Sequence, residues 1–131
     1  MNRMLKRALL LLMCGLSLNA HAEWTRVANF ERAEFYIDKK TINIKGDQRE
    51  VWSMMNYHSP QLDSKNHIFR STRSMLQMEC PSRYARVIHT AYFTDFMLRG
   101  EEIGKMGALP RWEPVPSDSP MNEILDLVCR S

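Results

Sequence analysis

The chain has 131 residues, a quarter of them charged, and a formal net charge of +3. Three of the 18 basic side chains lie near the start, ahead of an apolar run; without that segment, 15 basic residues balance 15 acidic ones. This balance argues against a general attraction to polyanions, so nucleic acid is not an expected partner. No later segment contains the roughly 20 apolar residues that a membrane span requires, so we expect no transmembrane segment.

Residues 1–22 have the pattern of a secretory signal peptide. Basic residues begin it, residues 8–13 are apolar, and Ala20-His21-Ala22 matches a cleavage site. Cleavage before Glu23 leaves a single mature domain, residues 23–131, in the periplasm or on the outer cell surface. Lipid attachment at Cys14 is disfavoured, because Met13 precedes it where a small residue is expected.

Export leaves two cysteines, Cys80 and Cys129. In an oxidising compartment they are expected to form one disulfide, and the alternative is a pair of buried thiols. Closing a loop of about 50 residues stabilises a fold by roughly 4 kcal/mol in the chain-entropy model.

The first half of the mature chain has the pattern of a β-hairpin. Polar and apolar residues alternate over 34–38, and Ile42 and Ile44 continue the pattern. Gly46-Asp47 supplies a turn before the β-favouring run 49–57. The polar segment 59–66 contains a proline and is predicted to be a loop.

Two further strands are predicted on either side of Pro81-Ser82. Alternation over 68–80 places Leu76, Met78 and Cys80 on one face, which directs the cysteine to the core. Residues 83–94 are apolar on both sides and predict a central strand. Its expected faces are Tyr84, Ile88 and Tyr92 on one side, and Ala85, Val87, Ala91 and Phe93 on the other.

Glycines and prolines over 100–116 predict an irregular or edge segment. Ser119 then caps a short helix with Pro120 at its first position, and an apolar stripe follows at helical spacing: Met121, Ile124, Leu125 and Val128. The predicted fold class is therefore α+β, a small antiparallel sheet with a C-terminal α-helix attached to it by the disulfide.

Several residues, in this order, resemble the surface-adhesin protein E family of bacterial exported proteins: Trp24, Tyr36-Ile37-Asp38, Thr41-Ile42, Val51-Trp52, Glu79-Cys80, Arg86, Tyr92, Trp112-Glu113-Pro114-Val115-Pro116, Ser119 and Cys129. The resemblance covers nearly the whole mature chain and implies the same sheet and disulfide-held helix. It also implies an envelope protein that binds other macromolecules, among them host matrix and serum proteins, with a link to haem. No ligand-contacting residue matches by motif.

The sequence of the mature chain does not have the motifs typical of catalytic or metal-binding sites. The three histidines of the mature chain, His58, His67 and His89, lack the close spacing typical of metal ligands. Met75 and Met78 are expected on opposite faces of a strand, so methionines are assigned to packing. With no nucleophile motif or phosphate loop either, we expect neither an enzyme nor a cofactor.

Charge is unevenly distributed along the mature chain, and residues 64–94 carry five basic groups against one acidic group. This predicts a contact surface for an acidic protein or polymer, made of Arg70, Arg73, Arg83 and Arg86. The alternative is that these arginines pair with acidic groups or keep a face soluble. The leading hypothesis is a non-catalytic envelope binding protein; a periplasmic haem or copper binding protein and a structural subunit, including a homodimer, are the alternatives.

Overall fold

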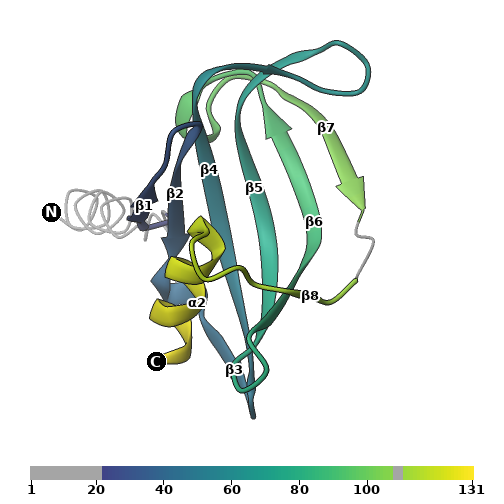
Figure 1. The fold of residues 1–131 in the computed structure, drawn as a ribbon. Helices are drawn as coiled ribbons and strands as arrows, with labels where there is room; N and C mark the ends of the chain where they lie inside the picture. The colour runs from purple at the N-terminus through teal and green to yellow at the C-terminus, as the bar shows by residue number, and fades with distance from the viewer. Residues whose placement is uncertain (1–21, 108–110) are drawn as a thin grey trace, which may run out of the picture.

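The structure, a computed structural model, describes residues 22–107 and 111–131. Over these residues an antiparallel sheet is followed by a C-terminal helix, which confirms the predicted fold class (Figure 1). The predicted leader, with Cys14, lies outside the described residues except for Ala22. The elements are β1 (Trp24–Asn29), β2 (Ala33–Asp38), η1 (Lys39–Thr41), β3 (Asn43–Lys45), β4 (Gln48–Leu62), β5 (Ile68–Glu79), β6 (Tyr84–Phe93), η2 (Phe96–Leu98), β7 (Glu102–Gly107), β8 (Glu113–Pro114) and α2 (Pro120–Cys129).

The sheet has the spatial order β1-β2-β4-β5-β6-β7, with β3 beside β4 and β8 beside β6. All of these pairs are antiparallel. The hairpin predicted at Gly46-Asp47 is confirmed, because Lys45 pairs with Gln48 across it. Gly46 has φ +61°, a left-handed conformation that glycine adopts without steric cost. The segment predicted to be irregular or at an edge forms β7, at the end of the sheet, and the two-residue strand β8.

The loop predicted over 59–66 is wrong in its first half, because β4 continues to Leu62. The pairing with β5 shifts register between Asn56 and Gln61, and Pro60 falls in this irregular stretch. A residue without an N–H is tolerated there, since it interrupts no regular ladder. The connection is confined to residues 63–67, where Asp63 Oδ1 accepts hydrogen bonds of 2.8 Å from two backbone N–H groups.

The prediction that Tyr84, Ile88 and Tyr92 share one face of β6 is also wrong. Residues 75 and 76 of β5 are consecutive, but their β6 partners, His89 and Val87, are two positions apart. Ile88 is the extra residue of a bulge, and a bulge reverses the alternation of side chains beyond it. The set predicted for the other face is divided in the same way, with Ala85 and Val87 before the bulge and Ala91 and Phe93 after it.

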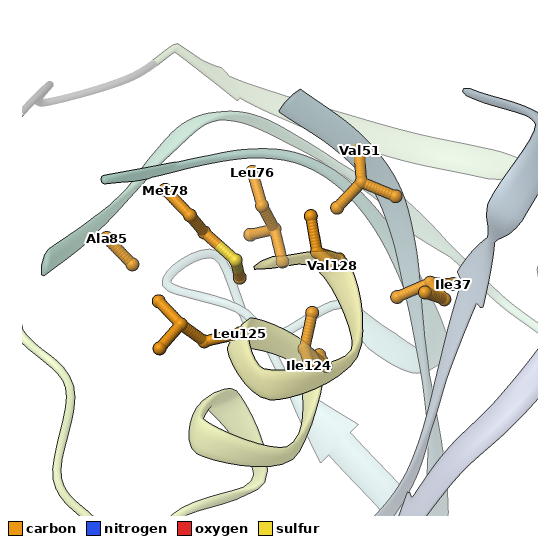
Figure 2. Packing of buried hydrophobic residues seen from close by; sticks show 8 residues of the cluster. All are labelled: Ile37, Val51, Leu76, Met78, Ala85, Ile124, Leu125 and Val128. Carbon is orange, nitrogen blue, oxygen red and sulfur yellow. The ribbon is translucent and has the colours of Figure 1, made fainter. Parts of the chain in front are cut away.

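One face of the sheet, here called the helix face, carries α2 and the segment that leads to it from β8 (Figure 1). Figure 2 shows that the apolar stripe of the helix meets side chains of β2, β4, β5 and β6 there. The buried cluster consists of Ile37, Val51, Leu76, Met78, Ala85, Ile124, Leu125 and Val128. This burial explains why a helix of only 10 residues is stable, since short helices depend on packing. Among the described residues, no helix is long and apolar enough to span a membrane.

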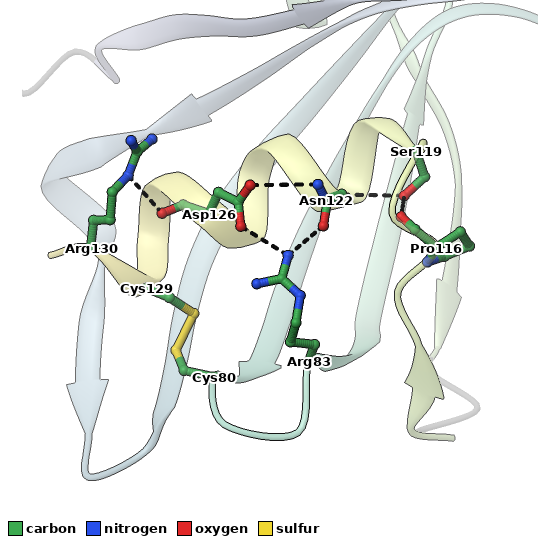
Figure 3. Close-up of polar contacts among 8 residues, drawn as sticks. All are labelled: Cys80, Arg83, Pro116, Ser119, Asn122, Asp126, Cys129 and Arg130. Carbon is green, nitrogen blue, oxygen red and sulfur yellow. Dashed lines mark hydrogen bonds and ion pairs between the residues drawn. A yellow bond between two sulfur atoms is a disulfide. The ribbon is translucent and has the colours of Figure 1, made fainter.

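Both ends of α2 are attached to the rest of the fold (Figure 3). Ser119 is the N-cap, and its hydroxyl accepts a hydrogen bond of 3.2 Å from the backbone N–H of Asn122. Pro120 follows at the start of the helix, as predicted. At the other end, Cys129 forms the predicted disulfide with Cys80, which follows β5 directly.

Candidate functional site

The four arginines of the predicted contact surface do not lie together. Side chains alternate along a strand, so Arg73 on β5 and Arg86 on β6 point away from the buried residues beside them, to the face that does not carry α2. This face is here called the opposite face. Arg70 lies toward the start of β5, near η2, and Arg83 lies on the turn between β5 and β6. Only Arg73 and Arg86 therefore share the expected surface.

Arg83 is engaged with the helix (Figure 3). Its guanidinium donates to the Asn122 side-chain oxygen and forms an ion pair of 2.8 Å with Asp126, one helical turn further on. Arg83 itself has φ +58°, the left-handed conformation that reverses the chain between the two strands. This contact matches the alternative considered from the sequence, in which an arginine pairs with an acidic group.

Arg73 lies on the opposite face against an aromatic ring. Its guanidinium carbon is 4.9 Å from the centre of the Trp52 ring, and His89 contacts the same ring edge-to-face at 5.1 Å. No carboxylate of a described residue lies within ion-pair distance of Arg73, and its Nε has no hydrogen-bond partner among them. Stacking uses the flat face of a guanidinium and leaves its terminal N–H groups able to bind a carboxylate or sulfate.

Arg70, near the start of β5, also stacks on an aromatic ring. Its guanidinium carbon lies 4.0 Å from the centre of the Phe96 ring, and Phe96 begins η2. The η2 segment is held to β5 through the buried Ser71, whose hydroxyl donates to the Asp95 carbonyl and accepts from the Leu98 N–H. The ring that supports Arg70 is therefore fixed in place by the sheet.

Arg86 belongs to a polar row that crosses the opposite face. Lys45 and the Gln77 amide donate to the same Glu50 oxygen, at 3.0 and 2.7 Å. Arg86 Nε donates to the Gln77 side-chain oxygen at 2.7 Å, and its guanidinium also stacks on Trp112 at 4.3 Å. The pKa of Glu50 lies below its usual value of 4.5, mainly because of the Lys45 hydrogen bond and then that of Gln77. Glu50 thus stays ionised at neutral pH and orients the row.

The sequence did not predict the rings that support these arginines: Trp52, Phe96 and Trp112. Each comes from a strand or loop distant in sequence, so only the sheet register and the path of the loops bring ring and guanidinium together. No local pattern in the sequence links these rings to their arginines.

The histidines and methionines are dispersed. His58 Nε2 is 3.0 Å from Asn29 Oδ1, His67 pairs with Asp63, and His89 contacts Trp52. Over residues 22–107 and 111–131, no three histidine, cysteine or acidic side chains are close enough to hold a metal ion. Met78 is fully buried in the core under α2, whereas Met75 lies on the other side of β5, as predicted.

Comparison with known proteins agrees with this architecture. The family model described as surface-adhesin protein E matches residues 24–130, and no curated protein matches the sequence. A structure of Haemophilus influenzae protein E is 13% identical, with a TM-score of 0.65 over 86% of this chain and 87% of that one. Its crystal form II is also 13% identical, with a TM-score of 0.68 over 86% and 91%. At this identity the structural likeness concerns the fold. The family match covers nearly all the described residues, and the chain therefore belongs to the surface-adhesin protein E family.

Proposed function

We propose that this chain is an exported, non-catalytic binding protein of the bacterial envelope whose partner presents carboxylate groups on a protein surface. Membership of a surface-adhesin family supports the envelope location and the adhesin-like role. The contact surface is the part of the opposite face around Arg73, extended by Arg86; Arg70 is left out, because it lies against Phe96 of η2. Arg83 is left out of this surface, because its guanidinium is bound to α2.

The observation that carries the proposal is the stacking of Arg73 on Trp52 without an acidic partner among the described residues. A guanidinium held flat against a ring loses less conformational entropy when it binds than a free one does. A carboxylate approaching along the plane of that guanidinium can accept two parallel hydrogen bonds. The rings of His89 and Trp52 lie beside the Arg73 guanidinium and add aromatic surface to it. Aromatic residues and arginine are enriched in protein–protein interfaces, so this surface suits a protein partner.

Replacing Arg73 with glutamine is expected to weaken binding of residues 23–131 to immobilised poly-L-glutamate by about tenfold, since one charge-assisted pair is lost. Surface plasmon resonance measures this change, and added salt is expected to weaken the wild-type interaction. The same measurement on immobilised heparin tests whether the partner is a sulfated polysaccharide. Arg83→Gln is the matched control and is expected to leave both affinities unchanged at a temperature where circular dichroism shows it folded.

Equal binding by wild type and Arg73→Gln would remove the Arg73 surface from the proposal. Loss of binding in Arg83→Gln alone would place the partner on the helix side of the β5–β6 turn instead. Tighter binding to heparin than to poly-L-glutamate, lost in Arg73→Gln, would replace the protein partner with a sulfated polymer.

Export makes a separate prediction about the leader. When the full chain is expressed in a Gram-negative host, the mature protein is expected in the envelope fraction with Glu23 as its first residue. Intact-mass measurement and N-terminal sequencing check this cleavage site. A product that retains residues 1–22, or one that carries a lipid on Cys14, would contradict it.

A further inference from the structure

A hollow of about 440 Å³ lies on the helix face, beyond the N-terminal end of α2. Figure 1 shows that α2 and the segment leading to it from β8 cross only the part of this face near β3, and no other α-helix of the described residues covers the rest of the face. Side chains of β2 and β4 form its floor, and the β1–β2 turn and the first helical residue form its walls. The lining consists of Phe30, Glu31, Arg32, Ala33, Phe35, Met55, Tyr57, Gln61 and Pro120. Its volume is typical of small-molecule sites, which span roughly 300–1,000 Å³.

The hollow is mostly apolar and aromatic. Phe30 meets Phe35 edge-to-face at 6.4 Å, and Tyr57 meets Phe69 in the same way at 5.5 Å, so the rings are held by their neighbours. Phe30 nevertheless remains 38% exposed at the opening. Rigid rings around an open apolar space can receive a ligand without first being rearranged.

The floor of the hollow suits a ligand with an acyl chain or an apolar ring better than it suits a peptide. β2 lies between β1 and β4, and β4 lies between β2 and β5, so the backbone groups of Phe35 and Met55 are already used in ladders. A peptide lying here would bury N–H and C=O groups without partners, at considerable cost in free energy. A hydrocarbon body has no such groups to satisfy.

Two donors border this apolar space. Arg32 is exposed at the rim, and no carboxylate of a described residue lies within ion-pair distance of it. Burial raises the pKa of Tyr57, although a side-chain hydrogen bond with Thr72 lowers it in part, so the hydroxyl stays protonated; it donates to Met55 Sδ at 3.6 Å, and thioether sulfur is a weak acceptor. Glu31 also lines the hollow, so a ligand with one negative charge fits better than one with several.

We propose that this hollow binds a free aliphatic monocarboxylate of the fatty-acid class, with the chain on Phe35, Met55 and Pro120 and the carboxylate at Arg32 and the Tyr57 hydroxyl. The site is on the helix face and uses none of the arginines of the proposed contact surface. Occupancy by such an amphiphile is therefore independent of the binding of an acidic partner.

Displacement of a dansylated undecanoic acid probe from residues 23–131 by laurate tests the proposal. Arg32→Gln is expected to raise the Kd for laurate about tenfold, because a charge-assisted hydrogen bond is lost, while leaving that for 1-dodecanol unchanged. Gln61→Trp, which fills the hollow from its rim, is expected to abolish binding of both. Arg26→Gln, an exposed arginine of β1 that pairs with Glu34, is the matched control and is expected to bind laurate as the wild type does.

Three results would overturn the proposal. Failure of laurate to displace the probe would show that the hollow does not bind fatty acids. An unchanged laurate Kd in Arg32→Gln would show that the carboxylate does not lie at Arg32. Sedimentation of the wild type, but not of Gln61→Trp, with phosphatidylglycerol vesicles, together with an absence of laurate binding, would assign the hollow to a membrane lipid instead. Because Arg32 is an exposed turn residue, its substitution is not expected to unfold the protein, and the test stands even if Gln61→Trp fails to fold.

Discussion

Removing the Cys80–Cys129 disulfide, by replacing both cysteines with alanine, is expected to lower the free energy of unfolding by about 4 kcal/mol. The two residues are 49 positions apart, so the bond removes much of the chain entropy of the unfolded state. It also holds the end of α2 against the sheet, where the helix supplies three of the buried core residues. Urea unfolding followed by circular dichroism measures the change.

Reduction of the wild type provides the internal control for this prediction. Dithiothreitol is expected to shift the urea midpoint of the wild type toward that of the double variant and to leave the variant unaffected. Equal midpoints for oxidised wild type and double variant would show that packing and the Arg83 contacts alone hold α2 in place. Titration of two thiols in the untreated wild type would contradict the disulfide itself.

Truncation of Leu125 to alanine is expected to cost about 3 kcal/mol, within the range of about 2–5 observed for large-to-small changes in well-packed cores. Leu125 is fully buried at the centre of the cluster that α2 forms with the sheet (Figure 2). The change leaves a cavity bordered by side chains of the sheet, which cannot collapse freely because strands fix their positions. Chemical denaturation of the purified variant measures the loss.

Leu62→Ala is the matched control for this substitution. Leu62 ends β4 and is 64% exposed, so the same chemical change is expected to alter stability by less than about 0.5 kcal/mol. Similar losses in the two variants would mean that the helix contributes no more to the core than an exposed strand end does. A large loss confined to Leu125→Ala supports the packing of α2 as the main apolar contact of the fold.

Local patterns were enough to predict most elements. The cap and proline at Ser119-Pro120 identified the start of the helix, and the two-residue turn at Gly46-Asp47 identified a hairpin. Each depends on residues within a few positions of one another. The β6 bulge at Ile88 was not predictable in this way, because a bulge depends on the register with β5. The extension of β4 past Pro60 has the same origin, since the neighbouring strand keeps that segment in the sheet.

The candidate site was predictable only in part. A local excess of arginine identified Arg73 and Arg86, which the structure places on one face, but it also included Arg83, which lies against α2. The number of charged residues in a segment cannot separate these cases, because it says nothing about where a side chain points or which residue it contacts. The unassigned hollow was not predicted at all, since its lining residues come from a turn, two strands and the first residue of the helix.

By itself the sequence determined most of the strand segments, the C-terminal helix, the disulfide pairing of Cys80 with Cys129, and the family. These depend on local periodicity, on capping residues and on the number of cysteines available. The tertiary structure alone decided which face each arginine occupies, which ring supports it and where the hollow on the helix face lies. Those features depend on register and on contacts between distant segments, where a shift of one residue moves a side chain to the other side of the sheet.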